Sequence, residues 1–357
     1  MNRVFVIAEA GVNHNGSKEL ARQLIDVAVD SGADAVKFQT FSAEKVASLS
    51  APKASYQNKT TDCSESHLTM LKKLELPYDW HPELKCYAED RKIQFLSTAF
   101  DAESLCFLNK QLQLNMLKIP SGEITNGPFL LEYAKTKKSL ILSTGMSTLA
   151  EIEFALSVLA FGLVDGEHPS TCAFKLAYLS KEGQAALKEK VSLLHCTSLY
   201  PAPVESVNLQ AMDTLRQAFG LIVGYSDHTA GTCIAIAAVA RGAKIIEKHF
   251  TLSRDLEGPD HLASLEPDEL KSMITDIRSV EKALGDGAKR PCIEELDTLR
   301  VARRSLYAKR KIEKGAKMGV DDIDILRPAT GSSPMNYWSI LGIEAHRTFE
   351  KGDLIEY

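Results

Sequence analysis

The sequence predicts a closed (β/α)8 barrel followed by a small β-rich module. Two observations predict the barrel: eight short β-rich runs recur over roughly the first 250 residues, and a segment with helical spacing of its apolar residues follows each run. Strands that alternate with helices pair in parallel, and eight such units are typical of a closed barrel. A third observation, the change of sequence character after Leu284, predicts the separate C-terminal module.

The composition indicates a globular protein with a large core. Of the 357 residues, 45% are hydrophobic and 25% are charged, and the formal net charge is -5. This balance gives no general attraction to nucleic acids or to anionic membranes, so neither is an expected partner. The seven cysteines are scattered and include no CxxC pair, which argues against a disulfide framework or a zinc knuckle and favours the reducing cytoplasm.

The N-terminus and the apolar runs indicate how the chain relates to membranes. The first residues, "MNRVFVIAEAG", lead directly into a strand and lack the features of a signal peptide. The longest uncharged apolar run, "CIAIAAVA", is much shorter than the ~20 residues that a membrane-spanning helix needs. We therefore expect a cytoplasmic protein.

The eight predicted strands are short runs rich in β-forming residues. They are "VFVIAEAG" from Val4, "AVKFQT" from Ala35, "QFLSTAF" from Gln94, "MLKIPSG" from Met116, "LILSTGM" from Leu140, "VSLLHCT" from Val191, "LIVGYSD" from Leu221 and "AKIIEKHF" from Ala243. An open doubly wound sheet would ordinarily carry GxGxxG after its first strand, and "AEAGVNHNG" does not match that pattern. The closed barrel is therefore favoured over the open sheet.

The helices are predicted from the spacing of apolar residues between these strands. In "SKELARQLIDVAVDSGA" the residues Leu20, Leu24, Val27 and Ala28 form an apolar stripe, and Gly32 suits a C-terminal cap. Further helices are expected to begin at Ala102, Gly127, Thr148, Leu209, Ala230 and Pro267. The connection over residues 41–92 is long and polar before two short helical patches, which is typical of either a lid or a disordered segment.

The C-terminal part of the chain is divided by the break "LGDGAKRP". We assign residues 1–284 to the barrel, 285–302 to a linker and 303–357 to the module. The module has the pattern of short strands and turns, with "EKG" occurring at Glu313 and again at Glu350. Its core is marginal at this length, so we expect it to pack on the barrel or on another subunit.

Polar residues accumulate at the end of every predicted strand. In a barrel of this type the loops at the C-terminal ends of the strands line one mouth, where the chemistry occurs. Each residue taken alone has the simpler interpretation of a cap or turn residue. Their joint placement favours an active site formed from Glu9, Lys37, Gln39, Ser97, Thr98, Lys118, Ser121, Glu123, Ser143, Thr144, His195, Ser226, Asp227, His228, Glu247 and His249.

His228 and His249 end consecutive strands, so their imidazoles can converge on one ion. Two histidines with open coordination positions suit a divalent transition metal that acts as a Lewis acid. The alternative is a pair of hydrogen-bonded structural histidines. By the period of two, Glu247 lies on the same side of its strand as His249, and Lys248 faces the helices.

Two lysines, Lys37 and Lys118, occur with hydroxyl residues in this set. Ammonium groups and hydroxyl donors bind phosphate or carboxylate groups where water is excluded. The alternative is a Schiff-base aldolase, in which one of these lysines attacks a carbonyl. The residues alone do not separate the two, although the histidine pair favours metal-assisted chemistry.

A set of motifs that spans nearly the whole chain identifies a resemblance. In order they are "IAEAGVNHNG", "VKFQT", "FLSTAF", "KIPSGE", "ILSTGM", "HCTSLYPAP", "GYSDHT", "EKHFT", "GPDHLASLEPDEL", "RRSLY" and "LRP". They resemble the sialic acid synthase family, which includes bacterial N-acetylneuraminate synthases and their legionaminate and pseudaminate relatives. The resemblance implies a (β/α)8 barrel followed by an antifreeze-like (SAF) domain, and a domain-swapped homodimer that uses manganese, magnesium or another divalent cation.

The resemblance also implies a reaction and roles for individual residues. The family condenses phosphoenolpyruvate with an open-chain N-acyl mannosamine and releases phosphate by C–O cleavage. The metal ligands would be His228 and His249. The resemblance does not assign the group that handles a proton of the incoming water, and our own hypothesis for it is Glu123. The groups that bind phosphoenolpyruvate would be Lys37, Thr98, Lys118, Ser121, Ser143, Ser198 and Ser226, and those that orient the sugar would be Glu9, Gln39, Tyr200, Asp260 and Arg327.

Two positions depart from the family pattern, and the acceptor sugar stays open. Ser198 stands where family members often have an asparagine, and "RPATGSSP" replaces the commoner "RPGxG" turn after Arg327. N-acetylmannosamine, giving N-acetylneuraminate, is the first expectation. The alternative is 2,4-diacetamido-2,4,6-trideoxymannose, giving N,N'-diacetyllegionaminate. A non-catalytic carbohydrate-binding protein is the alternative from a different functional class.

Overall fold

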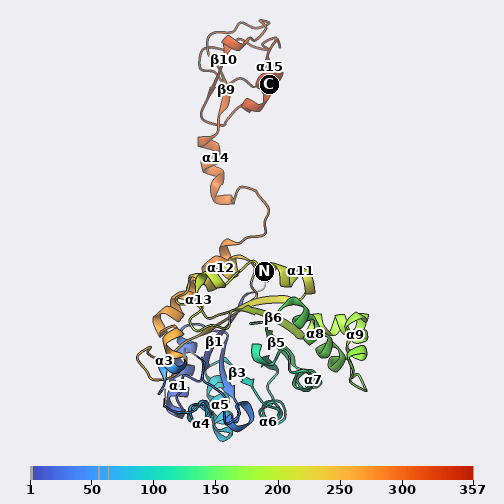
Figure 1. Cartoon of the computed structure of the whole chain (residues 1–357). Coiled ribbons are helices and arrows are strands. Elements are labelled where there is room, and N and C mark those ends of the chain that lie inside the picture. Colours follow the sequence, from blue (N-terminus) through green and yellow to red (C-terminus); the bar gives the residue numbers. More distant parts are fainter. Residues whose placement is uncertain (1–2, 55–56, 63, 357) are drawn as a thin grey trace. The chain divides into compact units, whose positions relative to one another are not determined.

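The computed structural model describes residues 3–54, 57–62 and 64–356, which form two compact units, Met1–Gly285 and Asp286–Tyr357. The first unit is a closed barrel of parallel strands in the order β1-β2-β3-β4-β5-β6-β7-β8, and helices surround it (Figure 1). The predicted barrel is therefore confirmed. Its strands are β1 (Phe5–Gly11), β2 (Ala35–Thr40), β3 (Gln94–Ala99), β4 (Met116–Ile119), β5 (Ser139–Ser143), β6 (Val191–Cys196), β7 (Ile222–Asp227) and β8 (Ile245–His249).

Each strand is followed by at least one α-helix. The helices of the first unit are α1 (Lys18–Asp30), α2 (Ala43–Val46), α3 (Gln57–Thr60), α4 (His67–Lys73), α5 (His81–Asp90), α6 (Ala102–Cys106), α7 (Gly127–Lys135), α8 (Leu149–Leu163), α9 (Thr171–Leu179), α10 (Lys181–Lys190), α11 (Ala211–Phe219), α12 (Cys233–Ala240) and α13 (Pro267–Ala283). Helices α6, α7 and α13 begin at the predicted residues. Helix α8 begins one residue after Thr148, whose side chain caps it.

Helices α1 and α12 differ from the prediction in detail. In α1 the buried residues are Ala21, Leu24, Ile25 and Ala28, so Leu20 and Val27 lie at the edge of the apolar face rather than in it. Helix α12 begins at Cys233 rather than Ala230. Gly231 precedes it with φ of 73°, and a residue in this left-handed region does not belong to a right-handed helix. Helix α11 likewise begins slightly later than predicted, at Ala211.

The connection between β2 and β3 is largely helical in its described residues. Helices α2, α3, α4 and α5 all lie within it. Met70 and Leu74 pack with Val12 and Phe41 in a small buried cluster. A structureless segment is therefore wrong for this part of the connection. The segment between β5 and β6 is also longer than one helix, because α9 and α10 follow α8.

The second unit has its own small core. It contains α14 (Leu296–Ala302), the antiparallel pair β9 (Ser305–Ala308) and β10 (Ile323–Leu326), and α15 (Tyr337–Ile340). The predicted module of short strands and turns is therefore confirmed, and α14 lies in the predicted linker. The buried hydrophobic side chains among the described residues of this unit are Leu306, Ala308, Ile312, Met318, Ile323, Ile340, Ala345, Phe349 and Ile355.

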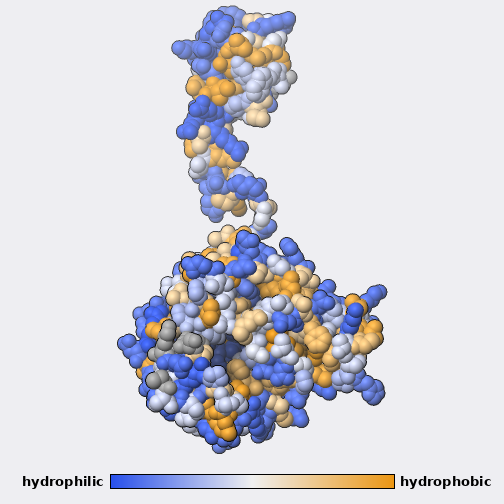
Figure 2. Space-filling model, viewed as in Figure 1, coloured by the Kyte–Doolittle hydropathy of each residue, from blue (hydrophilic) through white to orange (hydrophobic). Residues whose placement is uncertain are grey.

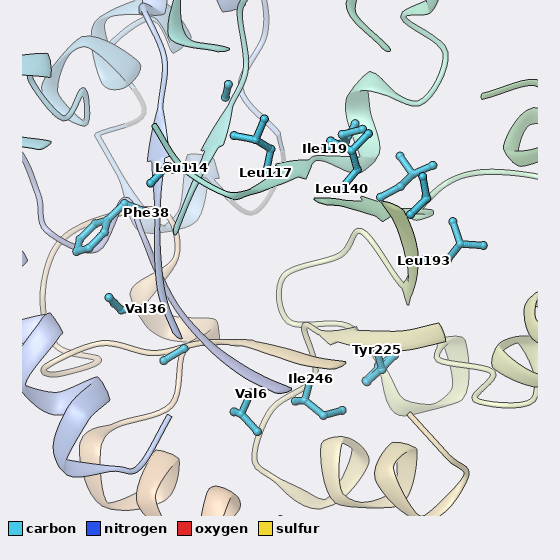
Figure 3. Close-up of a cluster of buried hydrophobic side chains, with 14 of the residues drawn as sticks. Val6, Val36, Phe38, Leu114, Leu117, Ile119, Leu140, Leu193, Tyr225 and Ile246 are labelled. Atoms are coloured by element: carbon cyan, nitrogen blue, oxygen red, sulfur yellow. The ribbon is translucent and has the colours of Figure 1, made fainter. Parts of the chain in front are cut away.

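Two layers of apolar side chains hold the barrel together. One layer lies between the strands and the helices, and Figure 3 shows Val6, Tyr225 and Ile246 of this layer pointing away from their strands. The other layer fills the barrel interior and consists of Ile7, Ala35, Leu96, Ile141, Leu194 and Ile245. Because side chains alternate along a strand, residues two positions beyond the interior layer also point into the barrel.

The described cysteines form no disulfide bonds. Cys63 lies outside the described residues, and the other six cysteines are free thiols. In the described part of the chain, no helix combines the length and apolarity that would let it cross a membrane.

Two buried histidines make the stability of the fold depend on pH. Burial lowers the pKa of His14 and that of His81 from 6.5 to about 4. Between about pH 4 and pH 6.5 both histidines are therefore neutral in the folded protein, whereas in the unfolded chain they take up protons as the pH falls below 6.5. The stability that this difference contributes is complete above pH 6.5, is lost as the pH falls, and stops changing below about 4.

We expect the free energy of unfolding to fall by about 1 kcal/mol per histidine at about pH 5.5 relative to neutral pH. Urea unfolding at the two pH values measures this difference. The His81→Gln protein is the control, because its unfolding should depend less on pH. An equal pH dependence in that variant would contradict the assignment to His81.

Candidate active site

A cavity of about 300 Å³ opens at the C-terminal ends of the barrel strands. A hydrophilic hollow is visible in the barrel unit in Figure 2. The cavity brings together thirteen residues that the sequence assigned to the site: Glu9, Lys37, Gln39, Thr98, Lys118, Ser121, Ser143, Ser198, Tyr200, Ser226, His228, Glu247 and His249. Further lining residues are Phe100, Pro120, Gly122, Met146 and Cys196.

The strands place these polar groups directly above the apolar interior layer. Ile7 of β1 belongs to that layer, and Glu9 follows two positions later. The same step leads from Ala35 to Lys37 on β2 and onward to Gln39. Corresponding steps end at Thr98, Ser143, Cys196 and Glu247 on β3, β5, β6 and β8. The barrel interior is thus apolar at one level and polar at the next.

The centre of the cavity is a network of buried charges. Lys37 Nζ lies 2.6 Å from Glu9 Oε2 and 3.5 Å from Glu247 Oε2. Lys118 Nζ lies 3.3 Å from the other oxygen of Glu247, Oε1. Lys37 also donates to Thr98 Oγ1 at 2.7 Å, and the Ser226 hydroxyl donates to Glu247 Oε1 at 2.8 Å. Glu247 therefore joins both lysines.

The two carboxylates of this network have opposite pKa shifts. Burial raises the pKa of Glu9 to about 7, although the Lys37 ammonium opposes the shift. Burial also acts to raise the pKa of Glu247, but Lys118 and Lys37 together hold it below its usual value. For Lys37, burial acts to lower the pKa, and the carboxylates of Glu247 and Glu9 more than offset this and raise it. Lys37 is therefore a cation at neutral pH.

The histidine pair lies beside this network. The ring centroids of His228 and His249 are 5.6 Å apart. His228 Nδ1 donates to the Thr197 carbonyl oxygen at 2.7 Å, which leaves Nε2 as the acceptor nitrogen, 3.2 Å from the Tyr200 hydroxyl. His249 Nδ1 is buried and has no hydrogen-bond partner among the described residues.

These two imidazoles fit a divalent cation. Burial lowers the pKa of His228 to about 4 and lowers that of His249 well below 6.5, so both rings are neutral at neutral pH, as metal ligation requires. The described residues contain no group of three or more histidine, cysteine or acidic side chains suited to a metal. The protein would thus supply two nitrogen ligands and leave the other positions open, an arrangement that suits catalysis better than a closed structural site.

Small residues shape the wall opposite the histidines. The Gly145 amide donates to Ser121 Oγ at 3.0 Å, and Ser121 Oγ lies 3.2 Å from Cys196 Sγ. A Cβ atom at residue 145 would lie 2.3 Å from Ser198 Oγ and 2.9 Å from Ser121 Oγ, so only glycine fits without moving them. Ser143 Oγ is buried without a hydrogen-bond partner in the described structure. This wall presents hydroxyl groups to a ligand.

Glu123 and Asp260, two predicted site residues of the barrel unit, do not line the cavity. Glu123 follows β4, and its carboxylate accepts a hydrogen bond from the Asn126 side chain at 2.7 Å. Asp260 is buried outside the lining set, with Oδ2 3.9 Å from His249 Nδ1, and burial raises its pKa to about 6. Arg327 belongs to the second unit, where it is exposed directly after β10.

Several polar residues at the strand ends point away from the cavity. His195 Nε2 contacts the Val207 carbonyl oxygen at 2.6 Å, and Ser97 bonds to Thr40 at 2.6 Å. Thr144 donates to the Leu194 carbonyl oxygen. These contacts are typical of structural polar groups at the end of a strand.

Glu247 is the main cavity residue to which neither the spacing nor the resemblance assigned a role. The period of two had placed it on the same side of β8 as His249, and this position was the available signal. Its contacts with Lys37 and Lys118 depend on β2 and β4, which sequence spacing does not place.

A larger cavity of about 840 Å³ lies beside the first and shares Met146, Cys196 and Ser198 with it. None of its lining residues is aspartate, glutamate, lysine or arginine. The smaller cavity contains the charged groups and both histidines. We therefore assign the chemistry to the smaller one.

Comparison with known proteins identifies the family to which the chain is similar. Residues 24–289 match the NeuB family and residues 303–357 match the SAF domain. The chain is 49% identical over 355 residues to the N,N'-diacetyllegionaminic acid synthase of Campylobacter jejuni, covering 99% of both chains. It is 45% identical over 338 residues to the enzyme of the same name from Legionella pneumophila, covering 95% of this chain and 89% of the relative.

A solved structure extends the comparison. The N-acetylneuraminic acid (sialic acid) synthetase of Leptospira borgpetersenii, in complex with citrate, superposes with a TM-score of 0.67 at 34% sequence identity. The match covers 84% of this chain and 90% of that chain. The family models, these relatives and the polar barrel mouth agree. The chain therefore belongs to the NeuB family of nonulosonic acid synthases.

Proposed function

We propose that the protein condenses phosphoenolpyruvate with an open-chain acylated mannosamine and releases phosphate. The observation that carries the proposal is the joint presence, in one buried cavity, of two lysines, a wall of hydroxyl groups and two neutral imidazoles. Cations and hydroxyl donors suit the two anionic groups of phosphoenolpyruvate. Neutral imidazoles suit a metal that activates a carbonyl.

Phosphoenolpyruvate would bind on the lysine side of the cavity. Lys37 and Lys118 offer charge-assisted hydrogen bonds, and Ser143 Oγ is a buried hydroxyl without a partner in the described structure. The further contacts would be Thr98, Ser121, Ser198 and Ser226. Glu9 and Glu247 keep the lysines in place before the substrate enters.

The acceptor sugar would bind on the histidine side. Gln39, Tyr200 and Glu9 line this part of the cavity, with Asp260 next to His249. His228 and His249 would hold manganese, magnesium or another divalent cation, which supplies Lewis-acid polarisation of the aldehyde oxygen when it is bound. The residues of the chain orient the sugar so that its aldehyde carbon faces phosphoenolpyruvate.

The reaction then forms one carbon–carbon bond and breaks one carbon–oxygen bond. The methylene carbon of phosphoenolpyruvate attacks the aldehyde carbon, and the adjacent C2 becomes an oxocarbenium-like centre. Water adds to C2 and loses a proton. We propose that Glu123, which lies in the turn after β4, accepts this proton. Phosphate leaves from C2 with the former enol oxygen, and the lysines stabilise its charge.

For the acceptor we propose 2,4-diacetamido-2,4,6-trideoxymannose. Identities of 49% and 45% to two N,N'-diacetyllegionaminic acid synthases support this choice. N-acetylmannosamine, the first expectation from the sequence, remains the second candidate, supported by 34% identity to the N-acetylneuraminic acid synthetase.

The setting of the enzyme is part of the proposal. The family resemblance supports a domain-swapped homodimer as the working form, and it gives Arg327 a role in binding the acyl group. The free thiols of the described cysteines agree with a reducing compartment such as the cytoplasm.

Phosphate release tests the proposed function. The full-length protein is incubated with phosphoenolpyruvate, each candidate sugar and Mn²⁺, with and without a chelator. We expect kcat/KM for the diacetamido sugar to exceed that for N-acetylmannosamine by about tenfold or more. The reason is that polar groups of the site that bind the second acetamido group have no partner when N-acetylmannosamine is bound. We also expect an isotopic label on the enol oxygen to appear in phosphate.

The possible results separate the candidates. Phosphate release from neither sugar would overturn the synthase proposal, and a preference for N-acetylmannosamine would overturn only the choice of acceptor. Borohydride trapping of substrate on a lysine would indicate the Schiff-base aldolase. We expect no trapping, because Lys37 is held as a cation and a protonated amine is not a nucleophile.

A further inference from the structure

A buried ion pair lies on the outer face of the barrel, directly behind the two histidines. Lys248 Nζ is 2.9 Å from Asp227 Oδ2, and the side chains of both residues are fully buried. Asp227 and Lys248 are register partners on the adjacent parallel strands β7 and β8. The pair therefore joins these two strands near their C-terminal ends.

The sequence neighbours of this pair belong to the cavity. Asp227 lies between Ser226 and His228, and Lys248 lies between Glu247 and His249. Because side chains alternate along a strand, the neighbours of an outward-pointing residue point inward. A displacement of either ion-pair partner thus moves the backbone that carries a histidine.

Additional hydrogen bonds extend the pair to the turn after β7. Asp227 Oδ1 accepts hydrogen bonds from the backbone N–H of Thr229 at 2.9 Å and from its hydroxyl at 2.8 Å. Lys248 Nζ also donates to the Thr229 carbonyl oxygen. These bonds connect Asp227 and Thr229, the residues on both sides of His228, to Lys248, the residue that precedes His249.

We propose that Asp227 and Lys248 are positioning residues that fix His228 and His249 relative to each other for metal binding. This inference rests on the proposed metal role of the two histidines. His228 has a second anchor, since its ring donates to the Thr197 carbonyl oxygen, but that bond sets the ring orientation and not the spacing between β7 and β8. Mutation of groups that orient metal ligands typically weakens metal affinity by about 10- to 100-fold.

A contribution to the stability of the fold does not by itself explain a buried ion pair at this position. Removing two charges from water is costly, and replacing a buried ion pair by neutral side chains of similar size is often neutral or stabilising. Removing one partner alone leaves an uncompensated buried charge and destabilises the protein. A double variant therefore separates positioning from stability.

The test compares Mn²⁺ binding by the full-length Asp227→Asn/Lys248→Met double variant, the Lys248→Met single variant and the natural protein. Electron paramagnetic resonance of free Mn²⁺ gives the Kd without a turnover assay. We expect the Kd of the double variant to rise by about tenfold or more, a change typical for lost supporting contacts around a metal. Its thermal midpoint should be higher than that of Lys248→Met, because its buried groups are neutral.

The control is a partly buried ion pair at the opposite end of the barrel. Arg278 Nη2 lies 2.6 Å from Asp34 Oδ2, next to the start of β1 and β2. An Asp34→Asn/Arg278→Met protein should keep the Mn²⁺ affinity of the natural protein.

Each result has a defined meaning. An unchanged Mn²⁺ affinity in Asp227→Asn/Lys248→Met would overturn the positioning role. An equal loss in the Asp34→Asn/Arg278→Met protein would overturn it as well, because the effect would then be general. If the natural protein itself binds no Mn²⁺, the proposed metal role fails, and this inference fails with it.

Discussion

The His228→Ala protein is expected to lose turnover by on the order of 10³-fold, because it lacks one of the two nitrogen ligands of the proposed metal site. The remaining imidazole, His249, lies on the adjacent strand. The described residues contain no cluster of three or more histidine, cysteine or acidic side chains that could hold the metal without His228. Phosphate release at saturating Mn²⁺ measures the loss. Direct Mn²⁺ binding should weaken in parallel.

The control for this variant is His81→Gln. His81 is as deeply buried as His228, but it contacts Thr40 Oγ1 at 2.7 Å on the helix side of the barrel. This substitution should lower the thermal midpoint and leave turnover near that of the natural protein. A His228→Ala enzyme with normal turnover would remove the metal role and would make a non-catalytic or imine-forming barrel the better hypothesis.

The second large effect is expected from Lys118→Met, which should lower kcat/KM for phosphoenolpyruvate by roughly 10²-fold. A hydrogen bond to a charged group contributes about 1.5–3 kcal/mol, and a tenfold change corresponds to about 1.4 kcal/mol. Lys118 is the better choice than Lys37, because Glu247 keeps Lys37 as its partner at 3.5 Å when Lys118 is removed. The buried carboxylate is thus not left alone.

Steady-state kinetics with each substrate varied in turn would measure this effect. The KM for the sugar should change less than that for phosphoenolpyruvate, since Lys118 is proposed to contact phosphoenolpyruvate directly and is not among the groups proposed to contact the sugar. Lys137→Met is the control, because Lys137 donates to the Gly162 and Leu163 carbonyl oxygens near the start of β5, at the other end of the barrel. A greater loss for the sugar than for phosphoenolpyruvate would contradict the assignment.

The predictions from sequence were most accurate where a periodic pattern carries the information. All eight strands were predicted, because each combines β-forming residues with a flanking helical segment and this local pattern survives folding. Helix starts were less accurate where a turn residue intervened, as Gly231 does before α12. The helices of residues 41–92 were underestimated, since short helices such as α2 and α3 depend on packing more than on their own sequence.

The residues of the candidate site were also predicted only in part. The strand ends pointed to eleven of the cavity residues, because the C-terminal ends of parallel barrel strands converge at one mouth. The sequence also counted His195 and Ser97 among the strand-end polar groups, and both face outward. A list of polar residues does not state which side of the strand each one occupies.

The sequence by itself determined the barrel, the separate C-terminal module, the histidine pair and the family motifs, because these depend on local patterns and on the order of elements. Only the tertiary structure decided that Glu247 bridges Lys37 and Lys118, and that Asp227 and Lys248 form a buried pair behind the histidines. The physical reason is that these contacts join residues from different strands. Their distances and burial are set by how the strands register and close into a barrel, which no single segment encodes.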